Sequence, residues 1–589
     1  MLSLLKHLKP KEWLLALASV VFVTTQVFLD LRLPRLMREI VLNLQLGGNT
    51  GEIWKLGGFM LLSTLGSAVC AFTVGFLSAR VSADFSMRLR GLVYDKAGSF
   101  SHEEMNKFTT ASLITRSTND ITQVGLLVAI SLQVLLRAPI MAVWATTEMV
   151  GSGWQWTLAV ATTLIIMLIV LVVMLIFVLP KFKVIQKQTD NLNAVTRENL
   201  TGLRVVRAYN AEELSAKKFK TANEDLTKTH LFTTRSLASV QPLLSILLNG
   251  LTLSVYFIGA HLINSAPLSA RAGLIADMTV FSSYAMQVIM AFIMITMVFI
   301  FLPRASVSAL RINEVLSVNP LISYPEISAQ PLSEAGEVEF KNVSFGYPNA
   351  EELVLKNVSF KIESGETVAF IGSTGSGKST LINLVARFYD ITAGELLISG
   401  VNIKDFSEKD LNKKLGYVAQ KAVLFSGTVK ENIALGSEES EGILESVIHS
   451  AGVAKASEFI SKMDNSYDSL ISQEGKNLSG GQKQRISIAR AICKKPDIFI
   501  FDDSFSALDY KTDKELRASL KENASNATVL IVAQRISTIM DADKIIVLEN
   551  GEVAGIGKHN ELLKDCAVYK EIALSQGISK GNHSKGGKD

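Results

Sequence analysis

The chain has little cysteine and little net charge, and each shortage excludes a class of protein. Its 589 residues include 3 cysteines without paired spacing, so neither a disulfide framework nor a zinc site is indicated. The formal net charge is +4 and no basic stretch is interleaved with aromatic residues, which argues against nucleic acid as a partner. The opening MLSLLKHLKPKEW lacks the short apolar core and cleavage site of a signal peptide, so we expect an amphipathic interfacial helix there.

Long apolar runs, by contrast, dominate the chain up to about residue 305. A membrane-spanning helix needs roughly 20 mostly apolar residues. Six stretches meet this requirement: 13–33, 56–77, 124–149, 156–180, 237–263 and 278–302. The sequence therefore predicts a multi-pass membrane protein and excludes a soluble ATPase.

Lysine and arginine predict the orientation of these spans. The connector 80–120 carries six such residues and the connector 181–235 carries eleven, far more than the loops on the opposite side. Because positive charge favours the cytoplasmic side, we place both connectors, both termini and the C-terminal half in the cytoplasm. Both connectors also read as helices that extend roughly 30 Å beyond the bilayer, with polar bends near 106–112 and 209–213.

Arg137 stands out within the third span. An ion at membrane depth is costly and usually faces protein or water, which makes it a candidate functional residue. A structural partner across the helix bundle is the equally weighted alternative.

A Pro- and Ser-rich stretch divides the chain. We expect a transmembrane domain at 1–315, a linker at 316–336, an α/β domain at 337–575 and a disordered tail at 576–589. Strand and helix patterns alternate after the linker, which is typical of a mostly parallel sheet.

A phosphate-binding loop is the strongest signal in this second half. The buried strand pattern VAFI runs into a glycine-rich loop and then a helix, the required context for this motif. The loop comprises Gly372, Ser373, Thr374, Gly375, Ser376, Gly377, Lys378, Ser379 and Thr380. Backbone N–H groups and the helix N-terminus would hold the phosphates of ATP, Lys378 would reach the β and γ phosphates, and Ser379 would bind Mg²⁺.

A second candidate phosphate-binding helix start follows about 100 residues later. The stretch LSGGQKQRISIARAI begins with Leu478, Ser479, Gly480, Gly481 and Gln482. Two such helix starts make little sense in one small domain unless the second faces the nucleotide of another domain.

With these motifs in this order, the chain resembles an ATP-binding cassette (ABC) exporter half-transporter over essentially its whole length. The resemblance implies the type I exporter fold: six transmembrane helices fused to an α/β P-loop ATPase domain. It also implies that the two bends are coupling helices, that the lipid bilayer surrounds the spans, and that the protein lies in a bacterial plasma membrane.

The resemblance also assigns roles to single residues. Tyr347 matches the aromatic residue that stacks on adenine, and Asp502 matches the carboxylate beside Mg²⁺. Gln420 matches the glutamine that contacts Mg²⁺ and senses the membrane domain. Ser506 and Asp509 match the dimer-contact loop.

Two positions depart from the family pattern, and both lie in the chemistry. Asp503 stands where the family has the Glu that polarises the attacking water, and it is one methylene shorter. Gln534 replaces the switch histidine and cannot carry an imidazolium charge. Since a displacement near 1 Å can cost ~100-fold in rate, this site should bind MgATP but hydrolyse it slowly.

The asymmetry predicts a different partner chain. This pattern resembles the degenerate-site subunit of bacterial heterodimeric multidrug exporters, whose partner is a homologous half-transporter with the consensus Glu and switch His. The intact signature Leu478–Gln482 would complete the partner's competent site. Small amphipathic drugs or lipids are the expected substrates. The alternatives are a homodimeric ABC lipid flippase or exporter, and a nucleotide-sensing regulatory membrane subunit without transport.

Overall fold

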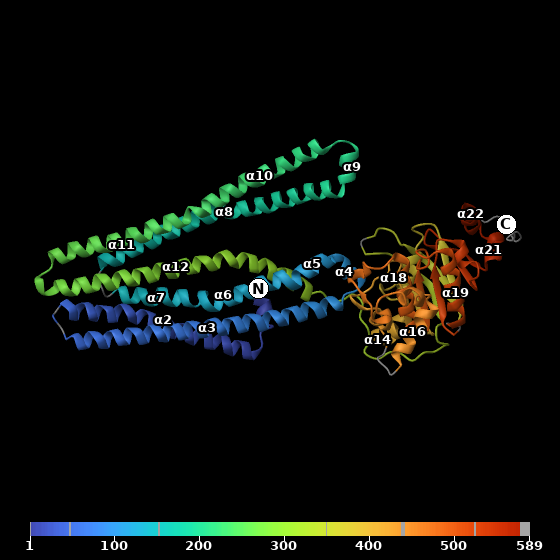
Figure 1. The fold of residues 1–589 in the computed structure, drawn as a ribbon, viewed down its shortest axis with the longest axis horizontal. Helices are drawn as coiled ribbons and strands as arrows, with labels where there is room; N and C mark the ends of the chain where they lie inside the picture. The colour runs from blue at the N-terminus through green and yellow to red at the C-terminus, as the bar shows by residue number, and fades with distance from the viewer. Residues whose placement is uncertain are drawn as a thin grey trace. The chain divides into compact units, whose positions relative to one another are not determined.

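The chain folds into two compact units (Figure 1). We describe them from a computed structural model that covers residues 2–45, 47, 49–150, 154–348, 350–437, 442–523 and 526–577. The first unit contains Met1–Gly98 and Thr110–Val318, and the second contains Ser99–Thr109 and Asn319–Asp589. Ser99–Thr109 thus clusters with the C-terminal unit, although it lies inside the expected transmembrane domain 1–315. Residues 578–589 of the expected disordered tail fall outside the described residues.

Long helices build the first unit. Among the described residues, six helical segments are long and apolar enough to cross a membrane, which confirms the six predicted spans. The elements are α1 (Leu2–Leu5), α2 (Pro10–Gln45), α3 (Thr50–Gly98), α5 (Thr110–Thr115), η1 (Arg116–Asp120), α6 (Ile121–Ile130), η2 (Ser131–Leu135), α7 (Arg137–Val150), α8 (Trp154–Thr201), α9 (Leu203–Ala208), α10 (Glu212–Ala238), α11 (Val240–Ser265) and α12 (Leu268–Leu316). Of these, η1 and η2 are π-helical turns that interrupt the third span.

The core of this unit forms where α12 packs against α2, α6, α7 and α11. Phe281 and Tyr284 of α12 and Trp156 of α8 are almost completely buried there. Trp156 and Tyr284 also satisfy their polar atoms, because each donates a hydrogen bond to a backbone carbonyl oxygen, on Val255 and Leu31 respectively.

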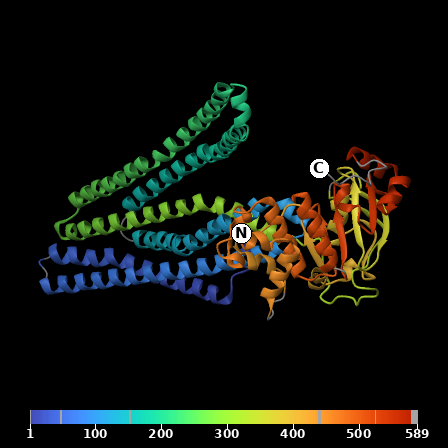
Figure 2. The same cartoon turned by 45° about the vertical axis from the view of Figure 1, so that its right-hand side comes forward.

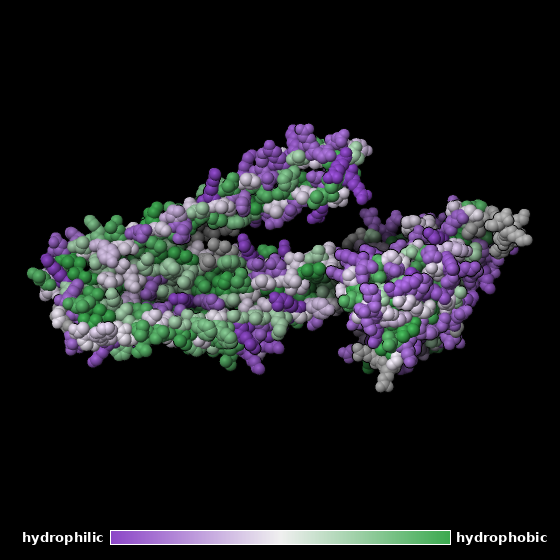
Figure 3. Space-filling view, in the orientation of Figure 1, coloured by the Kyte–Doolittle hydropathy of each residue, from purple (hydrophilic) through white to green (hydrophobic). Residues whose placement is uncertain are grey.

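A helical hairpin leaves this core. Helices α8 and α10 pack side by side and are joined through α9, and the chain turns at Asn210 (φ 51°), inside the predicted bend 209–213. Figures 1 and 2 both show the hairpin diverging from α12, and we call it the α8–α10 arm. In Figure 3 the tip of the arm is mainly hydrophilic, whereas hydrophobic side chains cover much of the remaining helices.

The second unit contains the expected α/β domain and the short helix α4 (His102–Phe108). Its strands are β1 (Val338–Phe345), β2 (Leu355–Ile362), β3 (Thr367–Gly372), β4 (Ala393–Ile398), β5 (Val401–Asn402), β6 (Leu415–Val418), β7 (Gly427–Thr428), β8 (Leu470–Ile471), β9 (Ile498–Asp502), β10 (Thr528–Val532), β11 (Lys544–Glu549) and β12 (Glu552–Gly557). Its other helices are α13 (Lys378–Val385), η3 (Ile403–Asp405), α14 (Glu408–Lys414), α15 (Val429–Ala434), α16 (Ile443–Val453), α17 (Ser457–Ile460), η4 (Ser466–Asp468), η5 (Gln473–Gly475), α18 (Gly480–Cys493), α19 (Tyr510–Asn523), α20 (Ile536–Ile539), α21 (His559–Asp565) and α22 (Ala567–Ser575).

The main sheet of this unit brings distant motifs to one edge. Its strand order is β12-β11-β3-β10-β9-β6, and the pairs from β11 to β6 are parallel. Parallel strands share the edge at which their carboxyl ends lie, where ligands bind in such sheets. Strand β3 leads into the phosphate-binding loop, while β10, β9 and β6 are followed closely by Gln534, Asp503 and Gln420.

Candidate nucleotide site

The phosphate-binding loop lies between β3 and α13, as its sequence context predicts. A side chain at Gly372 would place its Cβ 2.1 Å from the Leu548 carbonyl oxygen, so only glycine fits there. Gly377 caps α13 in the left-handed region at φ 96°, where its missing Cβ avoids Leu355. These glycines hold the backbone in a tight curve directly before a helix N-terminus.

Lys378 lies inside this curve. Its Nζ donates to the carbonyl oxygens of Gly372 at 3.0 Å and Ser373 at 2.7 Å. Burial lowers the pKa of the Lys378 ammonium, and the nearby carboxylates of Asp503 and Asp502 oppose that shift. An ammonium that is half withdrawn from water and held by loop carbonyls is well placed to exchange those contacts for phosphate oxygens.

Oxygen atoms suited to Mg²⁺ gather beside the loop. The Ser379 hydroxyl donates to Oδ1 of Asp502 at 3.0 Å, which joins the start of α13 to the end of β9. Burial raises the pKa of Asp502, and the hydrogen bond from Ser379 opposes that shift. Mg²⁺ typically takes one or two protein oxygens together with substrate phosphates. Ser379 and Asp502 therefore fit the ion, and the Gln420 amide contacts the neighbouring Asp503 at 3.3 Å.

The two residues that depart from the family pattern are in direct contact. Oδ2 of Asp503 accepts hydrogen bonds from the amide of Gln534 at 3.0 Å and from the amide of Gln420 at 3.3 Å. Burial raises the pKa of Asp503, whereas the hydrogen bond from Gln420 opposes that shift. Because two donors share one carboxylate oxygen, a water molecule must compete with them for that oxygen. Asp503 and Gln534 both line a cavity of about 130 Å³.

The backbone at Asp503 adds a further constraint. Its φ is 48°, in the left-handed region that residues with a side chain rarely adopt. Asp503 N–H donates to the Val532 carbonyl oxygen at 3.0 Å, and the Ser506 hydroxyl donates to the Asp503 carbonyl oxygen at 2.8 Å. The backbone of Asp503 is thus held in place. It cannot shift toward the nucleotide to make up for the methylene group that Asp lacks relative to Glu.

The signature motif begins α18. Ser479 caps the helix by accepting a hydrogen bond from the Gln482 N–H, while Gln482 Oε1 accepts from the Ser479 N–H at 2.8 Å. A Cβ at Gly480 would meet no atom within 4 Å, whereas one at Gly481 would lie 3.3 Å from the Ala507 carbonyl oxygen in the dimer-contact loop. Leu478 packs against the main apolar cluster. The first turn of α18 thus presents an open glycine.

Asp509 ends the loop 506–509, which the sequence predicts to be a dimer contact. Its Oδ1 accepts from the Thr512 N–H at 3.0 Å at the start of α19, which lowers the pKa of Asp509. Among the described residues, no hydrogen bond joins the signature Leu478–Gln482 to the phosphate-binding loop of the same chain. The two helix starts that the sequence predicts to bind phosphate therefore share no hydrogen bond among the described residues.

Tyr347 lies near the start of α13. Its hydroxyl is 3.0 Å from the Thr380 hydroxyl, and its ring meets Phe345 and Tyr389 edge-on at 5.0 and 5.2 Å. The sequence did not single out Tyr389, because a tyrosine outside the known motifs gives no signal before its neighbours are known.

Ion pairs join helices in the first unit. Arg137 of α7 contacts Asp30 of α2 at 3.0 Å, and Asp30 also accepts from the Ser67 hydroxyl of α3. Arg38 of α2 pairs with Asp277 of α12 at 2.5 Å. Of the two alternatives expected for Arg137, a functional role or a structural partner across the bundle, the structural partner exists and is Asp30.

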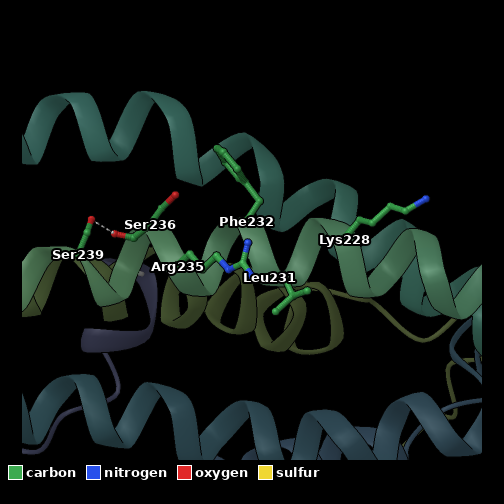
Figure 4. Close-up of a pocket in the computed structure, with 6 residues that line it drawn as sticks. All are labelled: Lys228, Leu231, Phe232, Arg235, Ser236 and Ser239. Atoms are coloured by element: carbon green, nitrogen blue, oxygen red, sulfur yellow. Dashed lines mark hydrogen bonds between the residues drawn. The ribbon is translucent and has the colours of Figure 1, made fainter.

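An open depression on the surface of α10 combines charge with apolar surface (Figure 4). Its volume is about 550 Å³, and it is lined by Lys228, Leu231, Phe232, Arg235, Ser236 and Ser239. Lys181 of α8 lies 5.7 Å from the centre of the Phe232 ring. Such a lining suits an amphipathic molecule with an anionic head group.

The two units together define an apolar helical membrane domain joined to a P-loop nucleotide-binding domain. Residues 16–301 match the family model for the ABC transporter transmembrane region, and residues 355–506 match the model for the ABC transporter. The chain belongs to the ABC transporter family, and residues 355–506 of its second unit form the ATP-binding part of that family.

Relatives are similar over nearly the whole chain. An uncharacterized ABC transporter ATP-binding protein of Mycobacterium tuberculosis is 36% identical over 98% of this chain and 99% of its own length. An uncharacterized ABC transporter ATP-binding protein of Bacillus subtilis is also 36% identical, with the same coverage. The ATP-dependent lipid A-core flippase of Haemophilus influenzae is 30% identical over 88% of this chain and 86% of its own.

One solved structure confirms the fold. A bacterial Atm1-family ABC exporter with ATP bound superposes with a TM-score of 0.77 at 22% identity, over 97% of this chain and 99% of that one. The predicted fold class, six transmembrane helices in the type I exporter arrangement fused to a P-loop ATPase domain, is thereby confirmed.

Proposed function

We propose that this chain is one subunit of a heterodimeric ATP-driven exporter. Its own phosphate-binding loop forms a slowly hydrolysing site, and its signature completes the competent site of a homologous half-transporter. The observation that carries the proposal is the contact of Gln534 and Gln420 with one oxygen of Asp503. A short acid fixed in this way is a poor general base, because base catalysis requires reach to the water that is activated.

The binding half of the site is complete. Lys378 and the N–H groups of the loop would hold the phosphates of ATP, and adenine would stack on Tyr347. Mg²⁺ held by Ser379, Asp502 and Gln420 would neutralise phosphate charge there. Strong binding without fast hydrolysis makes this a site that retains ATP over several cycles.

Transport follows alternating access in this proposal. Two ATP molecules hold the nucleotide-binding domains of the pair together, each lying between one chain's loop and the other chain's signature. Closure is passed to the helices through α4 and the bend at Asn210, and it opens the cavity outward. Hydrolysis at the partner's site resets the pair, while nucleotide at this chain's loop keeps the domains in partial contact.

We place the protein in a bacterial plasma membrane with its nucleotide-binding domain in the cytoplasm, because the basic connectors mark that side. Amphipathic drugs or lipids from the inner leaflet are the proposed substrates. Support comes from the mixed cationic and apolar lining on α10 and from the lipid A-core flippase among the relatives. That relative also keeps a homodimeric lipid flippase as the second candidate.

ATPase measurements in lipid nanodiscs test the proposal. The purified chain is compared with its complex with the half-transporter encoded beside it. We expect strong activity only in the complex, little change with Asp503→Ala, and loss of activity when the partner's catalytic Glu is changed to Gln. Lys378→Ala serves as the control that removes nucleotide from this chain's loop.

Two outcomes would overturn the proposal. Robust hydrolysis by this chain alone would support the homodimer. Equal release rates of labelled nucleotide from the two sites of the complex would show that this chain's loop does not retain ATP.

A further inference from the structure

A four-residue segment directly after the phosphate-binding helix contacts three other parts of the second unit. It consists of Arg387, Phe388, Tyr389 and Asp390, and we call it the junction. Arg387 is in the left-handed region at φ 50°, so the chain turns sharply away from the end of α13. A residue with a large side chain adopts this conformation only where its surroundings fix it.

The junction meets the proposed adenine platform through Tyr389. The rings of Tyr389 and Tyr347 are perpendicular with centres 5.2 Å apart, and both also meet Phe345. Since the Tyr347 hydroxyl is held by Thr380, the ring can respond to a stacked base mainly by changing its tilt against Tyr389.

The junction also holds α4. His102 stacks on Phe388 with ring centres 4.7 Å apart and an interplanar angle of 12°, and it meets Tyr389 at 6.0 Å. The Tyr389 hydroxyl is hydrogen-bonded to the side chain of Asn106 one turn further along α4. Two side chains of α4 thus depend on Tyr389.

Arg387 fixes the linker that follows α12. Its side chain is only 3% exposed, and its Nη2 donates to the Ser323 carbonyl oxygen at 3.1 Å. Its guanidinium lies 4.4 Å from the centre of the Tyr324 ring. Glu104 of α4 accepts from the Leu321 N–H at 2.8 Å, so the linker and α4 are also tied to each other.

We propose that the junction transmits occupancy of this chain's nucleotide site to α4 and the linker, with Tyr389 as the positioning residue. The inference rests on the proposed function, because the role of Tyr347 as the adenine platform is part of it. The signal comes from the adenine ring and not from the γ-phosphate. ADP and ATP should therefore produce the same change in α4, which suits a site that holds nucleotide without hydrolysing it.

Hydrogen exchange of the full-length chain in nanodiscs tests this inference. Backbone exchange is measured in Ser99–Thr109 and in the linker, without nucleotide, with MgADP and with MgATP. We expect either nucleotide to slow exchange by about fivefold, at the low end of allosteric couplings. Tyr389→Phe keeps the ring but loses the hydroxyl bond to Asn106, so it should keep part of the slowing. Tyr389→Leu should remove it while the affinity for a fluorescent ATP analogue stays within about threefold.

Further variants separate this inference from the proposed function. His102→Leu removes the ring of α4 that stacks on Phe388. It should also abolish the slowing of hydrogen exchange, without changing nucleotide affinity. Unchanged slowing in Tyr389→Leu, or slowing by ATP but not by ADP, would overturn the relay. Tyr347→Leu should weaken nucleotide binding itself, and full affinity in that variant would refute the adenine platform and with it the premise of the relay. If nucleotide still slows exchange but this chain's site hydrolyses ATP fast, only the proposal of a slowly hydrolysing site would be refuted.

Discussion

Gln534 donates a hydrogen bond to Oδ2 of Asp503 at 3.0 Å, so the two departures from the family pattern form one unit. Their contact explains why neither should restore hydrolysis alone. A longer acid at 503 would still meet an amide that occupies its oxygen, and a histidine at 534 would still face a short acid.

The double variant Asp503→Glu/Gln534→His should therefore raise ATP hydrolysis by the purified chain by at least about tenfold. General base catalysis contributes typically 10²–10⁴-fold, which leaves room for this gain. Each single variant should give less than the double. Phosphate release at saturating MgATP is the measurement, with Lys378→Ala added to the double variant as the control that abolishes it. No gain in the double variant would show that another feature limits the site.

The pH dependence of the residual activity should differ between wild type and Gln534→His. Gln534 does not titrate, and burial raises the pKa of Asp503 from its ordinary value near 3.8. The carboxylate is the active form, so wild-type activity should fall as the pH drops through this raised pKa, and Gln534 should add no second step. Histidine titrates near 6.5, so Gln534→His should add a step in that range. A Gln534→His profile that superposes on the wild-type profile would contradict this assignment.

Gly480→Ala should leave the folding of this chain unchanged while it impairs the proposed role of the signature in the partner's ATP site. A Cβ at Gly480 meets no atom within 4 Å, so thermal stability and ATP binding by the chain alone should be unchanged. In the proposed pair the same methyl group faces the other chain's phosphates, and ATPase activity should fall by ~10-fold or more. Gly372→Ala is the matched control. Its Cβ would clash with the Leu548 carbonyl oxygen, so this variant should lose nucleotide binding outright.

The pair Asp30–Arg137 should stabilise the helical unit. Removing one partner of a fully buried pair costs about 3–5 kcal/mol, and the partial exposure of these side chains reduces the expected loss to roughly 1–3 kcal/mol. Asp30→Asn and Arg137→Leu should each lower the Tm in detergent by several degrees. The exchange Asp30→Arg/Arg137→Asp should recover part of it. Additive losses in the exchanged protein would show that the contact itself contributes nothing.

Local sequence signals predicted the fold, and they named the residues that contact one another beside the phosphate-binding loop. The spans, the phosphate-binding loop and the signature each lie within about 20 consecutive residues, where apolar length, glycine spacing and helix capping are readable. The sheet then brings Gln420 and Gln534 to Asp503 because β6, β10 and β9 end at one edge.

Contacts between residues far apart in the chain were not predictable in the same way. Asp30 and Arg137 are separated by 107 positions, and His102 meets Phe388 only because Ser99–Thr109 joins the second unit. The π-helical turns η1 and η2 also leave no mark in the hydropathy pattern, since they alter backbone hydrogen bonding and not composition.

The cap at the start of α18 bears on how long two half-transporters stay together. Ser479 and Gln482 already satisfy each other's backbone groups, so a phosphate that approaches this helix has to displace a bond of similar strength. In the proposed pair, phosphate binding at this helix would exchange one hydrogen bond for another with a small net gain in free energy. The negative charge of the nucleotide would make that exchange favourable. In the proposed pair, an interface built in this way would be readily reversible: it would close when ATP bridges the two chains and open once that ATP is hydrolysed.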